Sequence, residues 1–204
     1  KNLAYLIVML LIVSSCGEYN RALNKGTVQE QYKMAVKMYE VQKYSKALRL
    51  FEKITPSYRG KPQMERIQYM VSQSNFNEKN YGLAGYYFNR FTKNYPKSSK
   101  REEAAFLSAL SYYKAAPSFS FDPTDTQTAL ESFQSFIDKY PNSDKQEEAN
   151  KYYAELRNKL EKKAFEIAKV YYTTAGYDSR NYRAAIVAFD NLLEDYLGTK
   201  YKEE

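Results

Sequence analysis

One repeated spacing constrains the fold of this chain more than any other feature of its sequence. The stretches AGYYFNRFTKNYPKSSKREEA (residues 84–104) and ALESFQSFIDKYPNSDKQEEA (residues 129–149) share ten of 21 residues without a gap. Both carry the spacing A-x3-F-x2-[FIL]-x3-Y, which occurs again from Ala47 and from Ala185. A chain that repeats one unit in this way folds as an array of modules, because each module buries its apolar face against the next.

The apolar positions of each copy predict an α-helix. They stand at i, i+4, i+7 and i+11, which lie on one helix face, as in Ala84, Phe88, Phe91 and Tyr95. A proline follows the tyrosine in the two central copies, at Pro96 and Pro141, and predicts the end of each helix.

A second helical stretch precedes each copy and carries a small residue where the two helices would cross: Ala35, Ser72, Ala109 and Ala168. The first two copies are 37 residues apart. A helix pair of this length with a small residue at the crossing resembles the tetratricopeptide repeat. The usual Trp and Gly of that repeat are absent, so the resemblance rests on Ala, Phe, Tyr and Pro. It implies an all-α solenoid with four repeats and the start of a fifth.

Two stretches depart from the regular period. The link KAAPSFSFDPTDTQT (residues 114–128) is about eight residues longer than the matching link in the second repeat, and its Asp122-Pro123 and Asp125-Thr126 predict a turn and a helix start. Lys145 to Tyr172 contains neither Gly nor Pro and predicts one long helix. The final LGTKYKEE matches the earlier restarts PKSSKREE and PNSDKQEE, so we expect a longer protein in which Glu203 and Glu204 begin a fifth repeat.

The N-terminus resembles the signal peptide of a bacterial lipoprotein. Leu3 to Val13 is an apolar run of eleven residues, too short to span a bilayer as a helix. Val13-Ser14-Ser15 then leads into Cys16, the single cysteine of the chain, as in a lipobox. The resemblance implies that residues 1–15 are removed, that Cys16 carries the lipid, and that residues 16–28 form a lipidated tether. Gly17 in place of Asp resembles the outer-membrane class; a buried structural Cys16 is the alternative.

The composition excludes several kinds of catalytic and metal site. The chain has no His, so an imidazole base, a histidine-based triad and the usual zinc site are unavailable. The net charge is +7, but Lys and Arg are interleaved with Asp and Glu, which indicates a solvated helical exterior rather than a nucleic-acid site. We therefore predict no metal and no cofactor, apart from the covalent lipid on Cys16.

The lipobox, the short tether and the repeats together resemble the BamD family of the β-barrel assembly machinery. FDPTDTQTALESFQSFIDKYPNS (residues 121–143) is the most similar part, and the Tyr-rich composition is closest to the Bacteroidetes branch. The resemblance implies a non-enzymatic lipoprotein on the periplasmic face of the outer membrane. It implies binding to the POTRA domains of the central barrel protein and to unfolded outer-membrane proteins. Repeats 1–3 would occupy residues 29–144, and the long helix, repeat 4 and the start of repeat 5 would occupy residues 145–204.

Two rows of aromatic residues are candidates for substrate binding. Three positions before the small residues stand Tyr32, Tyr69, Phe106 and Phe165, and four positions after them stand Tyr39, Phe76, Tyr113 and Tyr172. In tetratricopeptide solenoids these positions tend to line the concave surface. We name Tyr32, Tyr39, Tyr69, Phe76, Phe106 and Tyr113 as candidate substrate contacts. The alternative is that the rings fill the core between stacked helices.

The loop AGYDSRNYRAA (residues 175–185) is the candidate for docking the barrel protein. Arg180 and Arg183 flank Tyr182 there, and Tyr and Arg are favoured interface residues. The alternative is a solvated loop in which Asp178 and Arg180 satisfy helix ends.

Two other functions stay open. The chain could serve another envelope system, either pilus assembly or cell-wall synthesis, with the same anchor and fold. It could also be a helical cell-wall lyase that uses one carboxylic acid, for which the candidates are Glu65, Glu102, Glu103, Glu147 and Glu148. Their place in the first turn of predicted helices explains them without catalysis, because acidic groups there complement the helix dipole.

Overall fold

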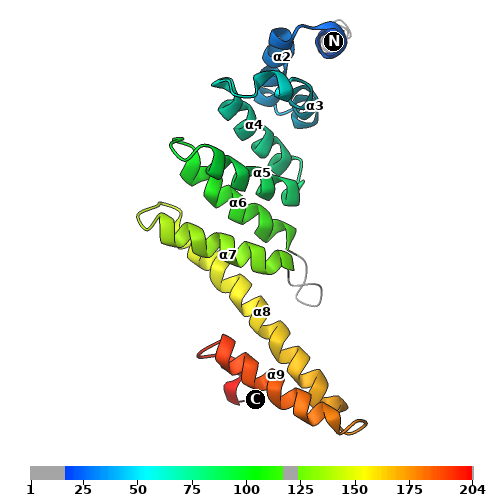
Figure 1. Cartoon of the computed structure of the whole chain (residues 1–204), viewed down its shortest axis with the longest axis vertical. Coiled ribbons are helices and arrows are strands. Elements are labelled where there is room, and N and C mark those ends of the chain that lie inside the picture. The colour runs from blue at the N-terminus through cyan, green and yellow to red at the C-terminus, as the bar shows by residue number, and fades with distance from the viewer. Residues whose placement is uncertain (1–16, 117–123, 204) are drawn as a thin grey trace, which may run out of the picture. The chain divides into compact units, whose positions relative to one another are not determined.

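The computed structural model describes residues 17–116 and 124–203, and these residues are helical apart from short turns. The lipobox Cys16, the signal residues 1–15, Asp122-Pro123 and Glu204 lie outside the described residues. Residues 17–25 are helical and are followed by α2 Val28–Glu40, α3 Tyr44–Ile54, η1 Thr55–Tyr58, α4 Gln63–Asn77, α5 Tyr81–Asn94, α6 Arg101–Ala115, α7 Thr124–Lys139, α8 Gln146–Thr174, α9 Arg180–Asp195 and η2 Lys200–Glu203 (Figure 1).

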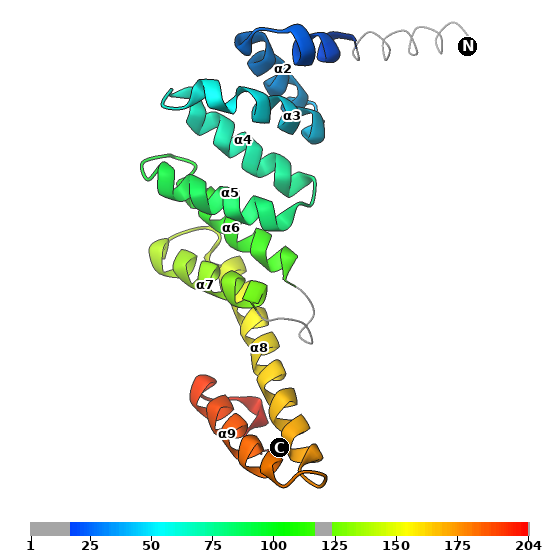
Figure 2. The ribbon, with the colours of Figure 1, turned by 45° about the vertical axis from the view of Figure 1, so that its right-hand side comes forward.

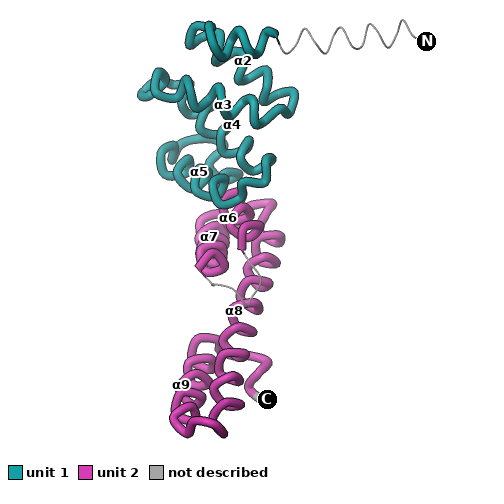
Figure 3. The backbone as a smooth tube through the Cα atoms, turned by 90° about the vertical axis from the view of Figure 1, so that its right-hand side faces the viewer, with its two compact units in different colours: residues 1–104 teal, residues 105–204 magenta. Residues whose placement is uncertain are grey.

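The helices pack in chain order within two compact units (Figure 3). Unit 1 comprises residues 1–104 and unit 2 comprises residues 105–204, so that α6 crosses the boundary. In unit 1, α2 packs on α3, α3 on α4, and α4 on α5. In unit 2, α7 packs on α8 and α8 on α9 (Figure 2). This order confirms an all-α array of sequential helix pairs, as the tetratricopeptide resemblance implies.

Alanine and phenylalanine in the first three copies of the repeated spacing form the core of their helix pairs, whereas Phe189 of the fourth copy is half-buried. Ala47, Phe51, Ala84 and Phe88 are fully buried in unit 1. In unit 2, Ala129, Phe133 and Phe136 belong to one cluster with Phe106 of α6 and Leu156 of α8. The helices α5 and α7 end at Asn94 and Lys139, just before the Tyr-Pro pairs that predicted their ends.

The long helix predicted from Lys145 to Tyr172 is confirmed as α8, which runs from Gln146 to Thr174. Its two halves serve different neighbours. Ala149 and Leu156 in the first half belong to the α7 cluster, whereas Phe165 in the second half contacts Phe189 of α9. One helix thus replaces two of the shorter helices found earlier in the chain.

Residues 17–25 differ from the expected tether. They form a helix that packs on the α2–α3 pair, and the Tyr19 side chain is buried in the core of that pair. Gly26 ends this helix, and a Cβ there would stand 2.5 Å from the carbonyl oxygen of Ala22 in the last turn of the same helix. In the described part of the chain, no helix is long and apolar enough to cross a membrane.

Candidate functional site

The first aromatic row packs inside the helix pairs. The Tyr32 ring lies 5.3 Å from that of Tyr58, and the Tyr69 ring lies 5.4 Å from that of Phe91. Phe106 has the same 5.4 Å spacing to Phe136 and is buried. These rings therefore contribute to the core of their own repeats, as the alternative interpretation proposed.

A recurring turn also covers this row. The Nζ of Lys100 lies 5.6 Å from the centre of the Tyr69 ring, and that of Lys145 lies 5.6 Å from the centre of Phe106. The equivalent residue of the third restart, Tyr201, stacks on Phe165 with ring centres 4.3 Å apart. In each turn a hydroxyl two residues earlier accepts a hydrogen bond from the covering residue's backbone N–H, the acceptors being Ser98, Ser143 and Thr199.

The second aromatic row is more accessible. Tyr39, Phe76 and Tyr113 are half-buried, whereas Tyr172 is 62% exposed. Tyr39 contacts Tyr44 at the start of α3, and Phe76 contacts Tyr81 at the start of α5. This row thus keeps part of its surface open to a ligand.

A chain of polar groups links these rings in unit 1. The Tyr39 hydroxyl donates to Oε1 of Gln73, and Nε2 of Gln73 donates to the Tyr69 hydroxyl at 3.0 Å. The Tyr69 hydroxyl is hydrogen-bonded to Glu103, whose carboxylate also accepts from Lys100 at 2.9 Å. These hydrogen bonds link α2, α4 and the first turn of α6.

Burial and the Glu103 contact raise the pKa of Tyr69. Burial opposes ionisation of Glu103, but hydrogen bonds from Tyr69 and Lys100 outweigh it and lower the pKa of that carboxyl. A general acid needs a raised pKa, whereas the lowered pKa of Glu103 favours its ionised carboxylate form. In unit 2, the hydrogen bond from Tyr113 to Glu155, 2.5 Å long, and burial raise the pKa of Tyr113 to about 12.

Unit 1 also holds a groove of about 740 Å³ between α3, α4 and α5, which the sequence reasoning missed. Met64, Ile67, Val71 and Leu83 are among its apolar lining residues. Arg59, Arg90 and Glu52 are its charged ones, and all three are exposed. Neither arginine makes an ion pair with another described residue within 4 Å. The apolar residues of α4 are visible in the sequence. Whether they line an open groove depends on the distance between α3 and α5, which the sequence does not give.

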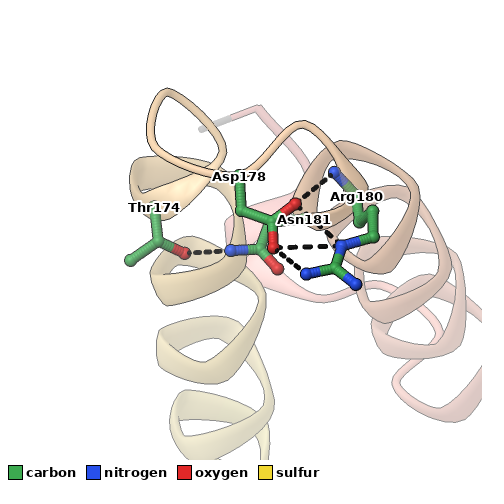
Figure 4. A network of polar contacts seen from close by, with 4 residues as sticks. All are labelled: Thr174, Asp178, Arg180 and Asn181. Atoms are coloured by element: carbon green, nitrogen blue, oxygen red, sulfur yellow. Dashed lines mark hydrogen bonds and ion pairs between the residues drawn. The ribbon is translucent and has the colours of Figure 1, made fainter.

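The candidate docking loop joins α8 to α9 (Figure 4). Asp178 accepts three hydrogen bonds from the Arg180 side chain, the shortest at 2.6 Å, and one from the Arg180 backbone N–H at 3.0 Å. These bonds lower the pKa of Asp178. Asn181 donates to the Thr174 hydroxyl at 3.0 Å and so ties α9 to the end of α8. Arg180 thus has a local partner within the loop.

Tyr182 and Arg183 are exposed, as Arg180 is, but neither side chain has a hydrogen-bond or ion-pair partner among the described residues. Further apolar side chains of the same helix pair are exposed and were missed by the sequence reasoning: Ile167, Val170, Ile186 and Val187. Their identity as apolar residues was visible, but their exposure depends on which faces of α8 and α9 meet. Within the described residues, no group of His, Cys, Asp or Glu is placed to hold a metal ion.

A family model described as "YfiO: Outer membrane lipoprotein" matches residues 24–204. A Rickettsia prowazekii protein named "Outer membrane protein assembly factor BamD" is 24% identical over 205 residues, covering 100% of this chain and 80% of that protein. A Haemophilus influenzae protein of the same name is 23% identical, covering 84% of this chain and 69% of that protein. A relative from Aquifex aeolicus is 29% identical over 133 residues, which is 62% of this chain but 40% of that protein.

These matches confirm the predicted family and, with it, the predictions of an outer-membrane lipoprotein and of a protein that is not an enzyme. The family match begins at residue 24, so it does not include Cys16. The Bacteroidetes origin stays a prediction. The chain belongs to the YfiO family of outer membrane lipoproteins.

Proposed function

We propose that this chain is a lipid-anchored scaffold of the β-barrel assembly machinery, attached through Cys16 and facing the periplasm. It binds the POTRA domains of the central barrel protein and receives unfolded outer-membrane proteins for insertion. The observation that carries the proposal is the family match over residues 24–204, on a chain whose described part is an array of helix pairs. The array consists of four tetratricopeptide repeats and the start of a fifth, with repeats 1–3 in residues 29–144 and the remainder in residues 145–204.

Unit 1 receives the substrate. Its half-buried aromatic residues, Tyr32, Tyr39, Tyr69 and Phe76, offer rigid contact area, and the three tyrosines also offer hydroxyl groups. In unit 2, Phe106 and Tyr113 hold the same two positions of the sequence pattern and are candidate contacts there. The groove beside α4 offers apolar surface together with Arg59 and Arg90. This combination suits an extended apolar strand that ends in a free carboxylate, because each guanidinium has five donors for carboxylate oxygens.

A binding titration with a labelled peptide tests the substrate site. The peptide alternates apolar and polar residues and ends in Phe with a free carboxylate, and its C-terminal amide is the control. We expect the double variant Arg59→Gln with Arg90→Gln to lose about tenfold in affinity for the acid and little for the amide. Glu52→Gln should strengthen binding of the acid, because it removes the one acidic group of the groove. Equal affinity of the wild type for acid and amide would exclude a carboxylate site in the groove.

A second titration separates the groove from the aromatic rows. Tyr39→Phe with Tyr69→Phe removes two hydroxyls and keeps both rings in the core, whereas alanine variants would also disturb the Phe88 and Phe91 contacts. Weaker peptide binding by this variant, with unchanged helicity, supports the rows as the substrate surface. Unchanged binding would show that the peptide does not use these two hydroxyls, and the Arg59 and Arg90 variants then test the groove.

The α8–α9 pair docks the barrel protein. Its supporting features are the exposed Tyr182 and Arg183, next to Arg180, and the exposed apolar residues of the same pair. Binding of purified POTRA domains is measured for Tyr182→Ala with Arg183→Ala, and for exposed Lys151→Ala on α8 as the control. We expect the first variant to weaken binding by about tenfold or more and the control to leave it unchanged. If the wild type binds no POTRA domain, a role in pilus assembly or cell-wall synthesis becomes the better account.

A further inference from the structure

The helix at residues 17–25 is held firmly on the first helix pair. Tyr19 is only 4% exposed, and its hydroxyl lies 3.4 Å from the carbonyl oxygen of Lys46. Lys53 donates to the carbonyl oxygen of Leu23 at 2.6 Å, and Lys37 pairs with Glu18 at 2.7 Å. Contacts therefore exist at the start, the middle and the end of this helix, to both α2 and α3.

This packing has a consequence for the anchor, given the proposed lipid on Cys16. Consecutive Cα atoms are about 3.8 Å apart, and Gly17 already belongs to the packed helix. No flexible tether then separates the lipid from the folded protein. The helix at 17–25 and the α2–α3 pair are held at the membrane surface.

The net positive charge of the protein is concentrated in the same segment. Residues 17–59 contain nine Lys and Arg against four Asp and Glu, a net charge of +5. Residues 60–204 contain 21 Lys and Arg against 20 Asp and Glu, a net charge of +1. The interleaving of charges noted in the sequence therefore holds for most of the chain but not for its first helix pair.

Several of these cations are available to an external anion. Arg21, Lys25, Lys33 and Arg49 are exposed, and none makes an ion pair within 4 Å in the part of the chain that the structure describes. Arg21 and Lys25 belong to the packed helix itself, and Arg49 lies near its Tyr19. Three of these cations thus lie on or beside the helix that follows the anchor, and Lys33 lies on α2.

We propose that the helix at residues 17–25 and the α2–α3 pair form a membrane-contacting surface that binds the anionic headgroups of phospholipids. The closeness of this surface to the membrane rests on the proposed lipid attachment at Cys16. The positive charge of the surface does not depend on that proposal. Basic residues beside a membrane anchor are attracted to anionic lipid, and this attraction falls off within a Debye length of about 8–10 Å. Held this close, the first helix pair is oriented on the membrane and not merely tethered to it.

Vesicle sedimentation tests the surface without the lipid anchor. The protein is the mature chain from position 16 with Cys16→Ser, and the probes are phosphatidylcholine vesicles with or without about one third phosphatidylglycerol. We expect binding to the anionic vesicles alone, and its loss at about 0.5 M salt. Binding to neither vesicle, or equally to both, would overturn the proposal.

Two matched variants locate the charge. One replaces Arg21, Lys25, Lys33 and Arg49 with Gln, and the control replaces four exposed cations of unit 2, Lys139, Lys151, Lys169 and Lys202, with Gln. We expect about a tenfold or greater loss of anionic-vesicle binding in the first and less than about twofold in the second. Equal losses would assign binding to net charge and overturn the proposed surface. Circular dichroism checks that both variants stay helical.

The same samples are titrated with purified POTRA domains and with an acidic protein. If the wild-type protein binds POTRA domains but not anionic vesicles, only the membrane surface is contradicted. If it binds anionic vesicles but no POTRA domain, only the proposed function is contradicted. If the first variant loses the acidic protein but the wild type never bound anionic vesicles, the basic surface serves a protein partner and the membrane proposal is wrong.

Discussion

At the residue scale, Tyr69 shows how one side chain combines core and surface roles. Its ring packs on Phe88 and Phe91, while its hydroxyl connects Gln73 to Glu103. The sequence predicted an aromatic residue on a helix face, and left open whether it was buried or available to a ligand. Its hydroxyl partners could not be predicted, because Gln73 and Glu103 meet it only after α4 and α6 have packed.

Tyr69→Phe tests this connection through its dependence on pH. The lowered pKa of Glu103 in the folded state means that its hydrogen bonds stabilise the protein above the pKa of the unfolded chain, about 4.3. That stabilisation is lost as pH falls through the folded pKa. We expect the variant to be less stable by about 1 kcal/mol at pH 7, with a smaller difference near pH 3. Denaturant unfolding at both pH values measures this, and a difference that does not narrow in acid would mean that Glu103 is not involved.

At the element scale, the helix pairs follow the sequence closely where contacts are local. The spacing of Ala, Phe and Tyr predicted the buried faces of α3, α5 and α7, and Pro96 and Pro141 predicted two helix ends. The helix at residues 17–25 was not predicted, because GEYNRALNKG has few apolar residues and two glycines. Its stability comes from burying Tyr19 on another pair, which no local pattern records.

The small residue at the helix crossing gives a prediction for α5. Ala84 is fully buried, so Ala84→Leu should overpack the crossing and destabilise the protein by about 1–3 kcal/mol. Gly82, two residues earlier, is exposed with open space around its Cα, so Gly82→Ala should stabilise α5 by about 0.5–1 kcal/mol. Chemical denaturation measures both. A neutral Ala84→Leu would show that the α4–α5 crossing is looser than described.

The turns within the first two helix pairs give a further prediction about stability. Gln42 and Lys79 occupy equivalent positions, 37 residues apart, with φ of 58° and 63°. L-residues are strained in this left-handed region, so Gln42→Gly and Lys79→Gly should each stabilise the protein by about 1 kcal/mol. Val41→Gly is the control, because Val41 has a φ of −89° and Gly there only adds freedom to the unfolded chain. Thermal melts compare the three, and destabilisation by Gln42→Gly would contradict the backbone described for the turn.

At the scale of the whole molecule, fold class and family followed from the sequence, whereas the surfaces required the structure. Four copies of one spacing sufficed for an all-α array of helix pairs, because each copy encodes its own contacts. The groove with Arg59 and Arg90, and the packed helix after Cys16, arise from contacts between repeats. The net charge of +7 also has a different meaning once the helix at residues 17–25 is seen to share a core with α2 and α3, because most of the excess positive charge lies in residues 17–59.

The role that we propose for this lipoprotein is that of a scaffold of the β-barrel assembly machinery. Affinity purification of the lipidated protein from solubilised outer membranes, followed by quantitative mass spectrometry, tests it most directly. We predict that a barrel protein with POTRA domains is recovered as the dominant partner in stoichiometric amount, and that Tyr182→Ala with Arg183→Ala reduces its recovery. Recovery of pilus or cell-wall proteins in its place would leave the fold and the family intact and contradict the proposed function.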